Sequence, residues 1–246
     1  MRFFLACFCL AVIGIIQLPY RLVILLTKKR DPKKAAHKSW AFCRRVGKAV
    51  MWTTGVKPTI YGRENLNAEW PVVYIGNHRS IFDIVLLYVL STDTTGFVAK
   101  KELEKVPVLA WWMKEAHSLF LDRENLREGL KTILQGVEYV NSGESMGIFP
   151  EGTRNKEKDL SAMLEFHAGS FKLATKAGVP IVPIVFYNTA DIFEDHKPWL
   201  KKARVIIRIG EPIRQEDLTA DQKKFLSDHV RGIMQEMLDR CAEEAS

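Results

Sequence analysis

The sequence of 246 residues contains 36 lysines and arginines and 29 aspartates and glutamates, so its formal net charge is +7. Its 47% hydrophobic and 26% charged residues are typical of a globular protein and exclude a disordered or fibrous chain. One long apolar stretch is too few for a polytopic membrane protein. The four scattered cysteines indicate neither a disulfide framework nor a zinc site.

The basic excess lies in residues 1–55, which we interpret as an N-terminal membrane-associated segment preceding one catalytic domain at 56–246. This segment has eleven basic residues and one acidic residue, a net charge of +10, whereas the rest of the chain carries −3. A nucleic-acid enzyme would carry its positive charge on the catalytic body, so we expect no nucleic-acid partner. Positive charge beside an apolar run instead indicates anionic membrane lipids.

The apolar run covers residues 3–26 and is interrupted by Gln17, Pro19 and Arg21. As one helix it would be about 36 Å long, against about 30 Å for the core of a bilayer. The interruptions leave two interpretations, a tilted span and a kinked helix dipping into one leaflet. A cleaved signal peptide is a third, weakened by the lack of an A-x-A-like site. In the first two, the basic residues that follow place the protein on the cytoplasmic face.

Residues 33–54 predict a second helix that is basic on one side and apolar on the other, with Trp40, Val46 and Val50 on the apolar side. Such a helix suits a membrane interface, which we favour because it follows the apolar run directly. The alternative is that its apolar side packs on the domain and its charged side faces solvent.

The body alternates between apolar runs of strand length and helical patterns. The predicted strands are 71–76, 96–100, 118–121, 146–149, 181–187 and 204–209. The predicted helices are about 81–91, 102–116, 123–141, 167–177 and 220–243. Asp122 is the expected cap of the third helix, Gly178 ends the fourth, and Thr219 with Gln222 forms a capping box before the last. This alternation predicts a single α/β domain with a largely parallel sheet flanked by helices.

In such a sheet, chemistry gathers where strands end. His78 follows the strand 71–76, and Asp83 lies five residues later in the first turn of a helix. A carboxylate on one ring nitrogen fixes the tautomer of a histidine and leaves the other nitrogen as a base. For the pair alone, a histidine that fills a turn or caps the helix is the better interpretation, since chance matches to this spacing are common.

Three further strand ends carry cations. The relevant residues are Lys100, which closes one strand, Arg123, which follows another, and the run Glu151, Gly152, Thr153 and Arg154, which follows the strand 146–149. Gly152 allows close approach of a ligand to the backbone, and a guanidinium such as that of Arg154 can bind a phosphate with two parallel hydrogen bonds. Cations and a base on one rim suit a phosphorylated substrate with a hydroxyl to deprotonate.

The order of these motifs resembles the glycerolipid acyltransferase family, and within it the bacterial 1-acyl-glycerol-3-phosphate acyltransferases. The motifs are N-H-x4-D at 77–83, A-K-K-E-L at 99–103, F-L-D-R at 120–123, F-P-E-G-T-R at 149–154 and V-P-I-V-P at 179–183. The resemblance covers about residues 70–190, and the N-terminal segment is similar to the membrane-associated helix pair of that family.

This resemblance implies transfer of an acyl group from a thioester to the free hydroxyl of lysophosphatidic acid. It implies that His78 is the base and Asp83 its orienting partner. It also implies that Arg154 and Lys100, with Arg123 as a weaker candidate, bind the phosphate. Glu151, Gly152 and Thr153 fall in the acceptor-binding motif. The co-substrate would be acyl-CoA or acyl carrier protein, with no cofactor and no metal.

Other functions remain open at this stage. His167 stands where the family often has a lysine, so the acceptor could be glycerol-3-phosphate or another lysophospholipid. A hydrolase that passes the acyl group to water is a second alternative, and a non-catalytic module that binds phosphorylated lipids is a third. A serine or cysteine acyl-enzyme is not expected, because there is no G-x-S-x-G motif and three of the cysteines lie in the N-terminal segment.

Overall fold

A computed structural model describes residues 2–66, 69–122 and 125–245. Its strands form one sheet in the order β1-β7-β6-β2-β5-β3-β4. Their bounds are Thr59–Tyr61 for β1, Val73–Gly76 for β2, Thr95–Lys100 for β3, Leu119–Leu121 for β4, Ser145–Ile148 for β5, Ile181–Tyr187 for β6 and Ile206–Ile209 for β7. The pair β6–β7 is antiparallel and the other neighbouring pairs are parallel, which confirms the predicted α/β sheet.

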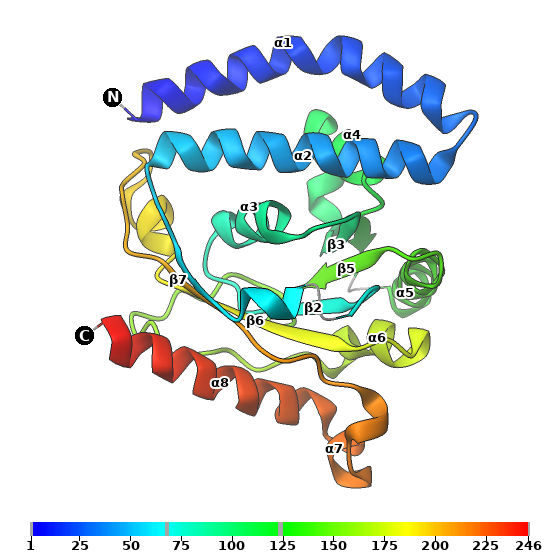
Figure 1. Ribbon diagram of the computed structural model, residues 1–246, viewed down its shortest axis with the longest axis vertical. Coiled ribbons are helices and arrows are strands. Elements are labelled where there is room, and N and C mark those ends of the chain that lie inside the picture. Colours follow the sequence, from blue (N-terminus) through cyan, green and yellow to red (C-terminus); the bar gives the residue numbers. More distant parts are fainter. Residues whose placement is uncertain (1, 67–68, 123–124, 246) are drawn as a thin grey trace.

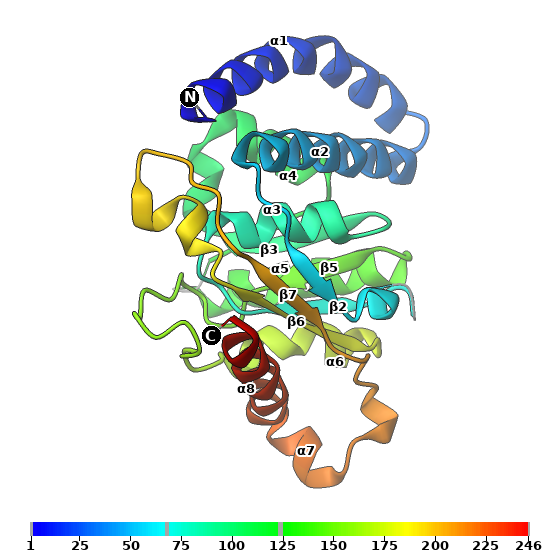
Figure 2. The ribbon, with the colours of Figure 1, turned by 60° about the vertical axis from the view of Figure 1, so that its left-hand side comes forward.

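Helices cover both faces of this sheet (Figure 1). Those of at least six residues are α1 (Arg2–Lys28), α2 (Pro32–Thr54), α3 (Ile81–Leu90), α4 (Pro107–Glu115), α5 (Leu126–Asn141), α6 (Lys172–Ala177) and α8 (Leu226–Ala245). One core cluster joins the sheet to α3 and α2, and a second joins it to α5, α6 and α8. Helix α1 lies outside α2, so α2 is enclosed between α1 and the body (Figures 1 and 2).

The predicted strands agree with the observed ones to within two residues at each end, and 181–187 coincides with β6. The prediction omitted β1, because its residues form no apolar run: Thr59 and Tyr61 are exposed, and Ile60 between them is half-buried. Three predicted helices are divided. Pro107 begins α4 after a short 3-10 helix, α6 follows another 3-10 helix, and the last helix is split at Phe225 into α7 (Ala220–Lys224) and α8.

The predicted cap of the third helix is wrong, whereas the other two terminal signals are confirmed. Asn125 caps α5 by accepting the N–H groups of Arg127 and Glu128, and Asp122 forms an ion pair with Lys101 instead. The helix therefore begins at Leu126, three residues later than predicted. The φ of 67° at Gly178 and the capping box of the last segment are as predicted.

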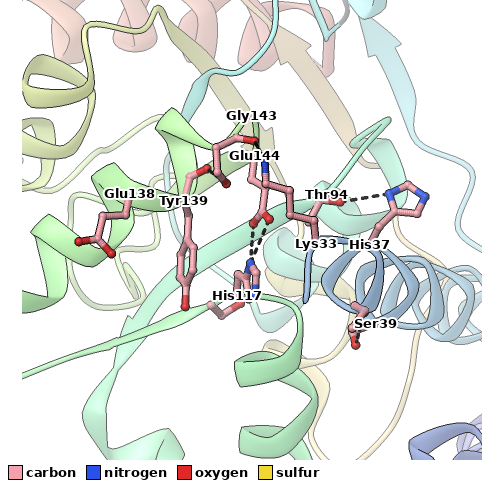
Figure 3. A network of polar contacts seen from close by, with 12 residues as sticks. Lys33, His37, Ser39, Thr94, His117, Glu138, Tyr139, Gly143 and Glu144 are labelled. Atoms are coloured by element: carbon pink, nitrogen blue, oxygen red, sulfur yellow. Dashed lines mark hydrogen bonds and ion pairs between the residues drawn. The ribbon is translucent and has the colours of Figure 1, made fainter. Parts of the chain in front are cut away.

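Helix α2 packs on the domain, so the alternative interpretation of residues 33–54 is the one observed. Trp40 is 3% exposed and its Nε1–H donates to Ser91 Oγ at 3.0 Å. The N-terminal end of α2 also contacts the loop that leads into β3, because His37 Nδ1 lies 3.1 Å from Thr94 Oγ1 (Figure 3). In the same network, His117 Nδ1 lies 2.8 Å from a carboxylate oxygen of Glu144 (Figure 3).

The polar residues that interrupt the apolar run hold α1 against α4. Gln17 Oε1 accepts the Nε1–H of Trp112 at 2.8 Å, and the guanidinium of Arg21 lies 4.2 Å from the ring centre of Trp111. By length and composition, α1 is the one helix within the described residues that could cross a bilayer, and little of its apolar surface is buried. It lies along α2 and does not project from the body (Figures 1 and 2).

A glycine substitution tests the pairing of β3 with β4. A Cβ at Gly96 would lie 2.4 Å from the backbone oxygen of His117, which cannot move without disturbing β4. We expect Gly96→Ala to lower the free energy of unfolding by about 1–3 kcal/mol. Gly232 in α8 has nothing within 4 Å of such a Cβ. Gly232→Ala should therefore raise stability by about 0.5–1 kcal/mol, through its helix propensity. Urea unfolding followed by circular dichroism measures both, and equal stabilities would contradict the proposed clash.

Candidate active site

The turn between β2 and α3 carries His78 at the carboxyl edge of the sheet. Asn77 fixes this turn to β6, because its side-chain oxygen accepts the N–H of Phe186 at 2.7 Å and its amide donates to the carbonyl of the same residue at 3.1 Å. The ring of His78 stacks on that of Phe149, with 4.5 Å between the ring centres. The imidazole is thus held on one face by the end of β5.

The predicted partners His78 and Asp83 are in contact, with 2.9 Å between Nδ1 and Oδ2. The side chain of Asp83 is fully buried. Its Oδ2 also accepts the backbone N–H groups of Arg79 at 2.7 Å and Ser80 at 2.8 Å, and its Oδ1 accepts the hydroxyl of Thr189 at 2.5 Å. An ionised carboxylate can only accept hydrogen bonds, so its contact with His78 requires a donor on the histidine ring. Nδ1 therefore carries the proton, and Nε2 is left with the lone pair that a base needs.

Glu151 supports the same turn from the end of β5. It is 4% exposed, and its two carboxylate oxygens accept the N–H groups of His78 at 2.6 Å and Leu164 at 3.1 Å. Burial raises the pKa of Glu151, although these N–H donors oppose the shift. Glu151, which the sequence assigned to acceptor binding, thus contacts the backbone of His78 and the segment that follows Arg154.

Arg79 is a buried cation that the sequence analysis did not assign. Its guanidinium donates to the carbonyls of Glu157, Asp159 and Ala162, which closes the loop after β5 over the His78 turn. Burial lowers the pKa of Arg79, and the nearby carboxylates oppose this effect. Its position inside the motif 77–83 was the only sequence signal for such a role.

The predicted phosphate ligands follow neighbouring parallel strands. Gly152 has a φ of 70°, which favours glycine, and it leads to the exposed Thr153 and to Arg154, whose side chain is 45% exposed. Lys100 is exposed at the end of β3. Because β2, β5 and β3 are parallel neighbours, these residues share the edge that carries His78. Arg123 lies outside the described residues.

Comparison with known proteins agrees with these motifs. Residues 57–187 match the model of a family described as Acyltransferase. The chain is 34% identical over 200 residues to 1-acyl-sn-glycerol-3-phosphate acyltransferase of Saccharomyces cerevisiae, covering 81% of this chain and 65% of that protein. It is 33% identical over 175 residues to the Haemophilus influenzae protein of the same name, covering 70% of each. The chain therefore spans just under two thirds of the yeast relative.

A solved structure shows the same fold. It is the crystal structure of the 1-acyl-sn-glycerophosphate acyltransferase PlsC from Thermotoga maritima, which superposes with a TM-score of 0.78 at 22% identity. The match covers 98% of both chains. The similarity therefore includes the N-terminal helices as well as the sheet.

The raised pKa of Glu151 predicts a pH dependence of stability. Between the usual value of about 4.3 and the higher native pKa, the folded protein binds more protons than the unfolded chain. The contribution of Glu151 to stability is therefore largest below this window and falls as the pH rises through it. We compare the free energies of unfolding of the wild type and Glu151→Gln. The value for the wild type minus that for the variant should decrease as the pH rises above about 4.

Urea unfolding of both proteins at a series of pH values measures this difference. Glu165→Gln is the matched control, because it removes an exposed carboxylate from the same segment. A pH slope for Glu151→Gln no steeper than that of the control would contradict the buried-carboxylate argument.

Proposed function

Because this chain belongs to the acyltransferase family, we propose that it transfers a fatty acyl group from a thioester to the free hydroxyl of 1-acyl-glycerol-3-phosphate, forming phosphatidic acid. The observation that carries the proposal is the hydrogen bond between His78 Nδ1 and the buried carboxylate of Asp83 at the sheet edge. The names of the yeast and Haemophilus relatives support this acceptor.

In the proposed mechanism, Nε2 of His78 removes the proton from the acceptor hydroxyl as its oxygen attacks the thioester carbon. The new carbon–oxygen bond forms, the carbon–sulfur bond breaks, and the proton passes from His78 to the leaving thiolate. Asp83 stabilises the imidazolium that exists between these two transfers. Such proton transfer contributes about 10²- to 10⁴-fold to the rate.

The acceptor would be oriented by its phosphate. Arg154 and Lys100 are exposed at the ends of neighbouring strands, where a guanidinium and an ammonium can bind the phosphate oxygens. Arg123 remains a further candidate from the sequence. Binding the non-reacting end turns the encounter between hydroxyl and base into an oriented one. The donor would be acyl-CoA or an acyl carrier protein, and the chemistry requires only that its acyl group be a thioester.

We further propose that α1 holds the protein in the cytoplasmic leaflet of a membrane, where the acceptor lipid resides. Its outward surface includes Phe4, Phe8, Ile15, Leu18 and Leu22, which are 58–72% exposed. Lysines and arginines follow at its C-terminal end, a position where they can meet anionic head groups.

Removing the base or its partner tests the reaction. We expect His78→Ala and Asp83→Asn to reduce kcat with lysophosphatidic acid and acyl-CoA by about 10²- to 10⁴-fold. His229→Ala, on α8 across the sheet, should retain wild-type activity. Product analysis by mass spectrometry measures the rate and the product together. Release of free fatty acid without an acceptor would indicate the hydrolase instead, and activity of His78→Ala equal to the wild type would exclude the mechanism.

Membrane binding is tested by substitutions, because α1 and α2 contribute to the packing of the body and cannot be deleted cleanly. We expect Phe8→Gln, Ile15→Gln and Leu22→Gln together to weaken binding to anionic vesicles by at least about tenfold, since full burial of even one such side chain is worth about 1.5–3 kcal/mol. Leu130→Gln with Leu134→Gln is the control, because it removes similar exposed leucines from α5. Vesicle flotation measures both, and equal loss in the two variants would contradict a specific role of α1.

A further inference from the structure

Glu194 links the two motifs of the site, although it belongs to neither. It lies in a short 3-10 helix after β6, and its side chain is 12% exposed. One carboxylate oxygen accepts the hydroxyl of Ser80 at 2.5 Å. The other accepts the N–H of Ile81 at 2.9 Å and an Nη1–H of Arg154 at 3.1 Å. A single carboxylate thus joins the first turn of α3 to the guanidinium that follows β5.

The contacts with Ser80 and Ile81 fix Glu194 independently of Arg154. Ile81 is the first residue of α3, a helix of 10 residues, and N–H groups at that end favour a negative charge. The hydroxyl of Ser80 adds a second donor from the cap position. Glu194 is therefore held to the turn that carries His78, and it can act as a fixed point for a more exposed partner.

Arg154 is that partner. Its side chain is 45% exposed, and an arginine side chain loses about 2 kcal/mol of rotamer entropy when it is immobilised. The bond to Glu194 uses one N–H, so the guanidinium retains further N–H groups in a defined plane. An anchored guanidinium presents these groups to a phosphate with less loss of entropy on binding.

We propose that Glu194 is a positioning residue that orients Arg154 for the phosphate of the acceptor. This inference rests on the proposed function, since it requires a phosphorylated acceptor at Arg154. It assigns Glu194 to ground-state binding of that acceptor, while proton transfer is left to His78.

Steady-state kinetics with lysophosphatidic acid varied at saturating acyl-CoA provides the test. Glu194→Gln keeps the size of the side chain and removes its charge. We expect it to raise the KM for lysophosphatidic acid about tenfold, which corresponds to the lower end of the free energy of a hydrogen bond to a charged group. The kcat should stay within about threefold of the wild type. Asp195→Asn removes a charge from the next, exposed residue and should leave both constants unchanged.

A double-mutant cycle with Arg154→Ala separates positioning from general damage. If Glu194 acts through Arg154, then adding Glu194→Gln to Arg154→Ala should raise the KM no further. A double variant whose KM rises by the product of the two single effects would overturn the inference. So would a fall in kcat without a change in KM. A lower KM in Glu194→Gln would also overturn it, since the carboxylate would then compete with the phosphate.

Glu194→Asp, which keeps the charge but shortens the reach, should give an intermediate KM, and thermal unfolding checks that each variant is folded. An active wild type with an unchanged Glu194→Gln variant would reject this inference alone. A folded wild type that acylates no lysophosphatidic acid would reject the proposed function, and this inference with it.

Discussion

The buried carboxylate of Asp83 is the constraint that shapes the site. A charge removed from water costs several kcal/mol unless donors replace the lost hydration, so its four hydrogen bonds must form together. Those donors come from His78, from the backbone of Arg79 and Ser80, and from Thr189 at the end of β6. The turn after β2 therefore has little freedom: any shape that lost one donor would leave the carboxylate partly unsatisfied. The orientation of the imidazole follows from this requirement.

Two further buried charges extend the constraint to the loop after β5. Glu151 accepts backbone N–H groups from both segments, and Arg79 donates to three carbonyls of the loop. Each ion is thus satisfied largely by the backbone of the segments it joins, which fixes the course of the main chain in a way that a pair of side chains alone would not. Three buried charges thereby position one partly exposed imidazole, with 15% of its side chain accessible.

Local pattern was enough to predict the pairing of His78 with Asp83, because both lie in one turn and a helix start brings them together. It was also enough to place Lys100 and Arg154 on the same edge, since parallel strands end on the same side. It could not reveal Thr189 or Glu194, which are 106 and 114 positions from their partners Asp83 and Ser80. Such contacts depend on the order of strands in the sheet, and no periodicity within a segment encodes that order. Asp122 failed as a cap for a similar reason, since its carboxylate pairs with Lys101 across two strand ends.

The polar residues of helix α1 have two consequences, one for its insertion in a membrane and one for its packing on the body. Gln17 and Arg21 weaken α1 as a membrane span, but in the structure both contact α4. Ile24 is also buried, and much of the remaining apolar surface of α1 is exposed. One side of α1 therefore packs on the body, and its other, apolar side is exposed. Its first turn meets the segment after β6, where the ring centres of Phe3 and Trp199 are 5.4 Å apart. Trp199 is five residues from Glu194. The stretch 194–199 thus contacts Arg154 and the turn of His78 at one end and the first turn of α1 at the other, so it links the candidate active site to the N-terminal helix.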